Sequence, residues 1–134
     1  MATILAHITV KPGSEERFEA IAKELYEATH RLETDVLRYE YWRGADPSSY
    51  YTLLSFTDFN SFITHQVSDH HESASPNIGE VVAGLRLEWV DPIDGASPLP
   101  PTESSALPAD PTELFMTYHE RYAAQVAQWW GSMR

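Results

Sequence analysis

The sequence predicts an α+β fold of the ferredoxin-like type, with elements in the order β-α-β-β-α-β and an antiparallel sheet. Three observations predict it: a first segment of alternating apolar residues, a helical stripe directly after it, and two aromatic-rich strands joined by a turn. The chain has 134 residues and 43% apolar content, enough for one domain with a core. We divide it into an α+β domain over 1–93, a Pro/Ser-rich linker over 94–111 and a C-terminal amphipathic helix within 112–134.

Hydrophobic periodicity predicts the first four elements. Residues 3–10 alternate between two faces and predict a strand. Apolar residues then recur every three or four positions, so a helix is expected from about 14 to 31. Residues 36–43 and 50–56 are rich in aromatic residues, and the Gly-Ala-Asp-Pro turn at 44–47 predicts that they form a hairpin.

The next helical segment begins after Asp58, a good N-cap, and its apolar positions are Phe59, Phe62, Ile63 and Val67. A short helical turn is expected to restart at Ser75-Pro76 and to stop at Gly84. Residues 85–90 then predict the last strand of the sheet.

The C-terminal region has a different composition. Residues 94–110 are rich in Pro and Ser and predict an extended linker. Asp110, Pro111 and Glu113 suit a helix start. A helix over 112–130 is expected to dock on the barrel, in the same chain or on the partner, through an apolar stripe: Phe115, Tyr118, Tyr122, Val126 and Trp129.

Composition excludes several classes of function. A net charge of −11 without a basic stripe argues against nucleic-acid binding. The chain has no cysteine, which excludes disulfides and thiolate metal sites and fits the cytoplasm. The apolar start is short for a signal peptide, and no segment approaches the roughly 20 apolar residues of a membrane span. No Gly-rich phosphate loop or GxSxG motif is present, so phosphoryl and acyl transfer have no support.

The stretch HQVSDHH places three histidines within residues 65–71. At 100° per residue, a continuous helix would aim His70 at the sheet, His65 along a far flank and His71 sideways. Zinc-binding pairs on a helix stand four positions apart, whereas these spacings are five, one and six. The spacing therefore predicts no metal site from this cluster, and His70 is the best candidate for chemistry.

Residues 3–92 resemble the antibiotic biosynthesis monooxygenase family of dimeric α+β barrels. The segments that carry the resemblance are HITVKPGSEERFEAI, ETDVLRYEYWRGADP, SFTDFNSFITH and the histidine pair of HQVSDH. One departure is Ser55, at a place on the third strand where family members commonly have Glu.

The resemblance implies a homodimer with a pocket between the sheet and the helices. Known members oxygenate quinols, anthrones or related phenolic polycycles with dioxygen, without metal or flavin, and other branches degrade haem. The function expected from it is a cofactor-independent monooxygenase. The alternatives are a non-catalytic barrel that binds a small molecule or a partner and, less favoured because the Asn and Trp of the haem-degrading branch are not matched, a haem protein.

Two groups of residues are candidates for the site. His70 is expected to take a proton from a phenolic substrate, and His65 matches the first family histidine. Candidates for binding a flat aromatic ligand are Tyr39, Tyr41, Tyr51, His7 and Trp42. The alternation places Tyr39 and Tyr41 on one face of their strand and Trp42 on the other. Core packing of the tyrosines and an interface role for His7 are the other interpretations.

Overall fold

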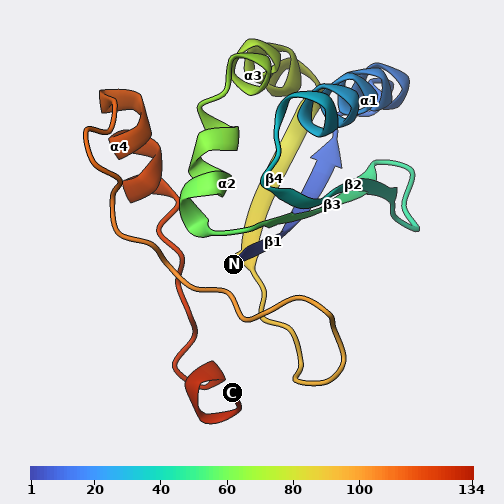
Figure 1. The fold of residues 1–134 in the computed structure, drawn as a ribbon. Helices are drawn as coiled ribbons and strands as arrows, with labels where there is room; N and C mark the ends of the chain where they lie inside the picture. Colours follow the sequence, from blue (N-terminus) through green and yellow to red (C-terminus); the bar gives the residue numbers. More distant parts are fainter.

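A four-stranded antiparallel sheet in the spatial order β2-β3-β1-β4 carries the fold of the computed structural model, which describes residues 1–134 (Figure 1). The elements in chain order are β1 (Ala2–Val10), α1 (Glu15–Leu32), β2 (Val36–Arg43), β3 (Ser49–Phe56), α2 (Phe59–Gln66), α3 (Asp69–Val81), β4 (Val82–Trp89), α4 (Glu113–Arg121) and a 3-10 turn (Trp130–Ser132). The predicted α+β class with an antiparallel ferredoxin-like sheet is confirmed. No helix is long and apolar enough to span a membrane.

Helices α1, α2 and α3 lie on one side of the sheet (Figure 1). The alternating residues of β1 fill the core beneath them, because side chains on a strand point to opposite faces in turn: Ile4, Ala6, Ile8 and Val10 are buried. Phe18 and Leu25 of α1 pack onto this surface. The opposite face of the sheet, which carries His7 and Thr9, has no helix on it.

The helical segment after β3 differs from the prediction. Helix α2 ends at Gln66, and Val67 and Ser68 are not helical. Helix α3 then begins at Asp69. Ser68 is extended (φ −66°, ψ 148°) and its side chain accepts a hydrogen bond from the backbone N–H of His71, so it is an N-cap that starts a new helix.

Two expectations for the following residues are therefore wrong. Helix α3 already runs from Asp69, so Pro76 lies inside it and does not begin a turn. The helix ends at Val81, where the chain passes into β4, and Gly84 is a strand residue opposite Thr9 and not a helix stop.

The C-terminal helix is much shorter than predicted. Helix α4 ends at Arg121, whereas the apolar stripe predicted a helix to residue 130. It docks on α2 of the same chain: Tyr122 packs edge-on against Phe62, with ring centroids 5.6 Å apart. Ala124 is the last residue of the chain that packs against the core cluster, and a helix without a packing partner is marginal in water. Val126 and Trp129, the last stripe residues, are exposed.

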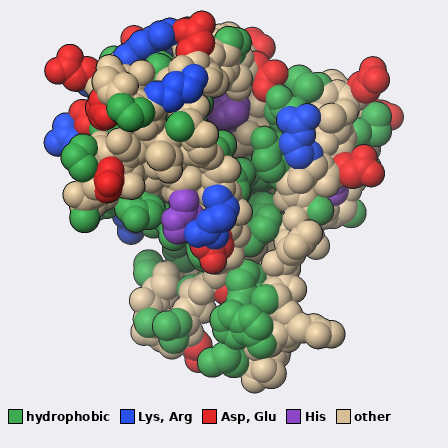
Figure 2. All heavy atoms as spheres, turned by 180° about the vertical axis from the view of Figure 1, so that it is seen from behind, with side chains coloured by type: hydrophobic (Ala, Val, Ile, Leu, Met, Phe, Trp, Pro, Cys, Tyr) green, Lys and Arg blue, Asp and Glu red, His purple; other side chains and the backbone are tan.

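The linker is tied to the sheet at one point. Thr102 is fully buried, donates its hydroxyl hydrogen bond to the Val90 carbonyl and accepts from the Thr3 backbone N–H. Arg134 closes the chain on Asp91, with an Nη2 to Oδ1 distance of 2.7 Å. Seen from behind, this region forms a lobe below the main body, with hydrophobic side chains gathered on it (Figure 2).

Candidate functional site

The predicted ligand-binding residues divide between the two faces of the sheet. Register partners in an antiparallel sheet share a face, and Trp42, Tyr51 and His7 are consecutive partners across β2, β3 and β1. This row lies on the face without helices, where Trp42 is 58% exposed. Tyr39 and Tyr41 lie on the helix side, as the alternation predicted. The five residues therefore cannot line one pocket of a single chain.

The row on the open face carries a small charged network. His7 Nε2 lies 3.0 Å from Glu88 Oε2, and Arg86 donates to the same oxygen at 3.0 Å. The hydrogen bonds from His7 and Arg86 lower the pKa of the Glu88 carboxyl. The Tyr51 ring stands edge-on to His7, with centroids 5.5 Å apart. An interface role for this row stays a prediction.

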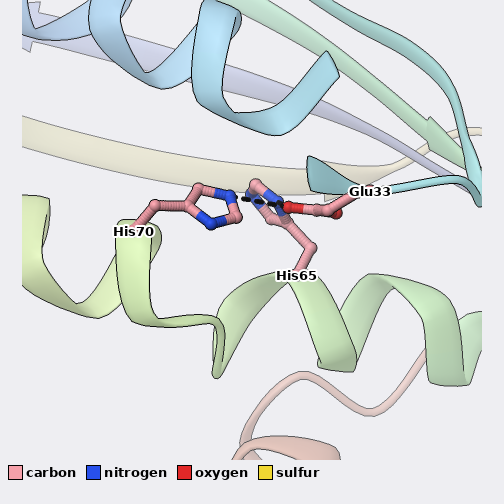
Figure 3. A group of neighbouring side chains, drawn as sticks. All are labelled: Glu33, His65 and His70. Carbon is pink, nitrogen blue, oxygen red and sulfur yellow. Dashed lines mark hydrogen bonds and ion pairs between the residues drawn. The ribbon is translucent and has the colours of Figure 1, made fainter. Parts of the chain in front are cut away.

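The histidines occupy positions other than those predicted. Figure 3 shows His65 of α2 and His70 of α3 directed at the carboxylate of Glu33, the C-cap of α1. His65 Nδ1 is 2.7 Å and His70 Nε2 is 2.8 Å from the same oxygen, Glu33 Oε1.

The predicted orientations assumed a continuous helix, and the break at Val67 and Ser68 makes them wrong. His65 is fully buried and points inward, while the His70 side chain is 15% exposed. The structure thus brings together two histidines that the helical wheel separated. Glu33 was missed, because nothing in its local sequence indicates which residue the end of α1 meets.

His71 is the histidine that lines the cavity between sheet and helices. Its Nδ1 lies 3.1 Å from the Gln66 carbonyl oxygen, which can only accept, so Nδ1 carries the proton and Nε2 has a free lone pair. Burial, and then the charge on neighbouring His65, lower the pKa of His71 to about 4. The imidazole is therefore neutral at neutral pH. The predicted sideways orientation did not place His71 at the cavity; the sequence signal that could have done so was Ser68-Asp69, a typical helix start.

The cavity has a volume of about 380 Å³ and mostly apolar walls. Its wall includes Tyr39 and Tyr41 of β2, Thr52 of β3, Leu87 of β4 and Tyr122 after α4. The Thr52 hydroxyl is buried and has no hydrogen-bond partner. A cavity of this size, apolar with a few polar groups, suits a small aromatic molecule.

The two tyrosines of β2 form a hydrogen-bonded pair in this wall. Their hydroxyl oxygens are 3.0 Å apart. Burial raises the pKa of Tyr41 to about 12 and also raises the pKa of Tyr39. Both phenols therefore stay protonated at neutral pH and can donate hydrogen bonds. Tyr39 packs on His65 with ring centroids 4.9 Å apart, which links the cavity wall to the Glu33 cluster.

Ser55 is isolated from this cavity. Its hydroxyl lies 3.0 Å from that of Thr3, a register partner on the side of the sheet away from the helices, and Met1 covers it. No carboxylate occupies this place in the chain.

A family model described as antibiotic biosynthesis monooxygenase matches residues 1–76, which is more than half of the chain. The chain belongs to this family. The match includes β1 to α2 and the Glu33, His65 and His71 positions, and ends within α3. No curated protein shows significant similarity to the chain.

Solved structures of the antibiotic biosynthesis monooxygenase type share the fold. A candidate monooxygenase from Caulobacter crescentus is 21% identical over 69% of this chain and 90% of its own, with a TM-score of 0.65. One from Nitrosomonas europaea is 16% identical over 69% of this chain and 99% of its own, also with a TM-score of 0.65. One from Bacteroides thetaiotaomicron is 23% identical over 78% of this chain and 95% of its own, at the same TM-score.

Proposed function

We propose that the chain is a monooxygenase that binds a quinol, an anthrone or a related phenolic polycycle in the cavity between sheet and helices, and oxygenates it with dioxygen without a bound cofactor. Family membership supports the reaction class. The observation that supports this class of substrate is the apolar cavity of about 380 Å³, which is lined by tyrosines and has only a few polar groups. Fused aromatic rings match such walls, and the polar groups can orient a hydroxyl or ketone oxygen.

The cavity groups have complementary roles in this proposal. His71 Nε2 accepts a hydrogen bond from a substrate hydroxyl, because its Nδ1 proton is held by Gln66. The hydroxyls of Tyr41 and Thr52 donate to an oxygen on which negative charge develops when the substrate ionises. In this ionisation the substrate proton passes to His71 Nε2, and the adjacent substrate anion offsets the low pKa of that imidazole. The anion is electron-rich enough to react with dioxygen, and the proton is returned to the oxygen that leaves as water. For an anthrone the balance is one CH₂ and one O₂ giving one C=O and one H₂O.

His65 and His70 were the predicted catalytic residues, and neither lines the cavity. His65 packs on both Tyr39 and His71, each with ring centroids 4.9 Å apart. We therefore assign His65 a positioning role, and His71 replaces His70 as the residue that contacts the substrate.

The proposal is tested by oxygen uptake with anthrones and quinols under air, with product identified by mass spectrometry. We expect turnover above the uncatalysed rate, a loss of about 10²-fold or more in kcat/KM for His71→Ala, and a smaller loss for Tyr41→Phe. His30→Ala is the matched control, because His30 is an exposed histidine on α1 that does not line the cavity, although its ring centroid lies 6.5 Å from that of Tyr39. The proposal fails if no substrate of the panel is consumed faster than in buffer, or if His71→Ala and His30→Ala behave alike.

The second candidate is a barrel that binds such a ligand without converting it. Ser55 favours it, since it stands where related proteins commonly carry a carboxylate and is sequestered by Thr3. Quenching of the tyrosine and tryptophan fluorescence by an anthrone, with no product after prolonged aeration, would support this candidate.

A further inference from the structure

We propose that Glu33, His65 and His70 bind one divalent first-row transition-metal ion, of the class of Zn²⁺, Co²⁺ or Fe²⁺. This goes beyond the proposed oxygenation, because the three residues lie outside the cavity that would hold the substrate. They come from three elements that meet at one point: the C-cap of α1, the last turn of α2 and the first turn of α3.

The geometry is that of two imidazoles and a carboxylate facing one centre (Figure 3). One ligand atom from each residue lies within 4.8 Å of the others, and the two nitrogens approach Glu33 Oε1 to 2.7 and 2.8 Å. With metal–ligand bonds of about 2.0–2.1 Å, adjacent ligand atoms lie roughly 3 Å apart. The two nitrogens and the oxygen are therefore near the spacing of metal ligands, and an ion between them requires side-chain rotations.

The hydrogen-bonding state of His65 provides an independent observation. A carboxylate only accepts, so without a metal His65 donates its Nδ1 proton to Glu33. Its Nε2 is buried and has no hydrogen-bond partner. A metal ion at Nδ1 moves the proton to Nε2.

The His65 ring is surrounded by other aromatic rings. The rings of Tyr39, Phe56 and His71 have centroids 4.9 to 5.2 Å from that of His65. This packing and the complete burial of the side chain hold Nδ1 directed at Glu33.

The site is open to ions from one side. A surface cleft of about 490 Å³ has Glu33 and His70 in its wall, with the carboxylate of Asp69 and the hydroxyls of Ser68 and Ser73 beside them. No Lys or Arg lines this cleft. A partly buried carboxylate in a chain of net charge −11 attracts cations, and the cleft leaves room for water on the ion.

The ligand set selects the class of metal. Two imidazole nitrogens and one carboxylate suit Zn²⁺, Co²⁺ and Fe²⁺, and they are poor ligands for Mg²⁺ and Ca²⁺, which prefer oxygen. Three protein ligands also leave coordination positions free, as in sites that bind an exchangeable water.

The test uses the full chain, stripped of metal with a chelator that is then removed, and titrated with Co²⁺. We expect visible ligand-field absorption that saturates at one Co²⁺ per chain and disappears when Zn²⁺ is added. Zn²⁺ should also raise the thermal unfolding midpoint, because it binds the folded state, whereas Mg²⁺ should not.

Variants decide where the ion binds. His70→Asn removes a partly exposed ligand with little loss of packing and should weaken Co²⁺ binding at least tenfold. His30→Asn removes an exposed histidine near the end of α1 and should bind as the parent does. If the parent shows no saturable Co²⁺ spectrum, if His70→Asn binds as tightly as the parent, or if both variants lose binding equally, the proposed site is wrong. No substrate is involved, so this result is independent of the oxygenation assay.

Discussion

His71 Nδ1 lies 3.1 Å from the carbonyl oxygen of Gln66, so one hydrogen bond spans the break between α2 and α3. The bond uses a carbonyl that the end of α2 leaves without a helical partner. It also fixes the tautomer of an imidazole that burial keeps neutral.

The buried position of His71 predicts a pH dependence of stability. Its pKa is lowered to about 4 in the folded chain from an ordinary value of 6.5. Below pH 6.5 the unfolded chain takes up this proton and the folded chain does not, so stability is complete above pH 6.5 and falls toward pH 4. The loss is at most about 3 kcal/mol.

Urea unfolding of metal-free protein between pH 7 and pH 4 measures this loss. His71→Gln should remove that part of the pH slope, while His30→Gln should retain it. An NMR titration in which the His71 ring protonates near pH 6.5 would contradict the prediction.

A second prediction concerns the cap of α3. Ser68 accepts from the His71 N–H and donates its hydroxyl to the His65 carbonyl at 2.7 Å. Ser68→Ala should lower the free energy of unfolding by about 1 kcal/mol, because both ends of the break lose a partner. Ser73→Ala is the control: Ser73 is exposed within α3 and bonds only to a carbonyl of its own helix, so its loss should be within about 0.5 kcal/mol. Equal losses in chemical denaturation would show that Ser68 is not a significant cap.

The sequence was sufficient for the sheet, because strand periodicity and the turn at 44–47 are local signals. The sequence was not sufficient to predict where α2 ends and α3 begins. Val67 continues the apolar stripe of α2 and hides the break, and the helix start at Ser68-Asp69 is a weaker signal than that stripe. The Glu33 contact could not be predicted either, since residues 32 to 37 positions apart meet only through the packing of α1 on the later helices.

A third prediction concerns the open face of the sheet. Trp42, Tyr51 and His7 form a row there that no helix covers. Members of this family are typically dimeric, and we expect two chains to meet through this face. Trp42→Glu should then convert a dimer to a monomer in light scattering, because a buried unpaired charge is costly in an interface. Leu114→Glu, which changes an exposed apolar residue on α4, should leave the assembly unchanged. A parent protein that is monomeric at all concentrations would contradict this prediction.

The last prediction concerns the docking of α4 on α2. Phe115 is 9% exposed and belongs to the hydrophobic core cluster, although α4 is only nine residues long. A helix of that length is not stable alone, so its contacts with α2 must hold it. Phe115→Ala should lower the free energy of unfolding by about 3 kcal/mol, since it removes a large buried side chain. Met116→Ala, at an exposed position in the same turn, should cost less than about 0.5 kcal/mol. If both variants unfold at the same denaturant concentration as the parent, α4 does not contribute to the stability of the α+β domain.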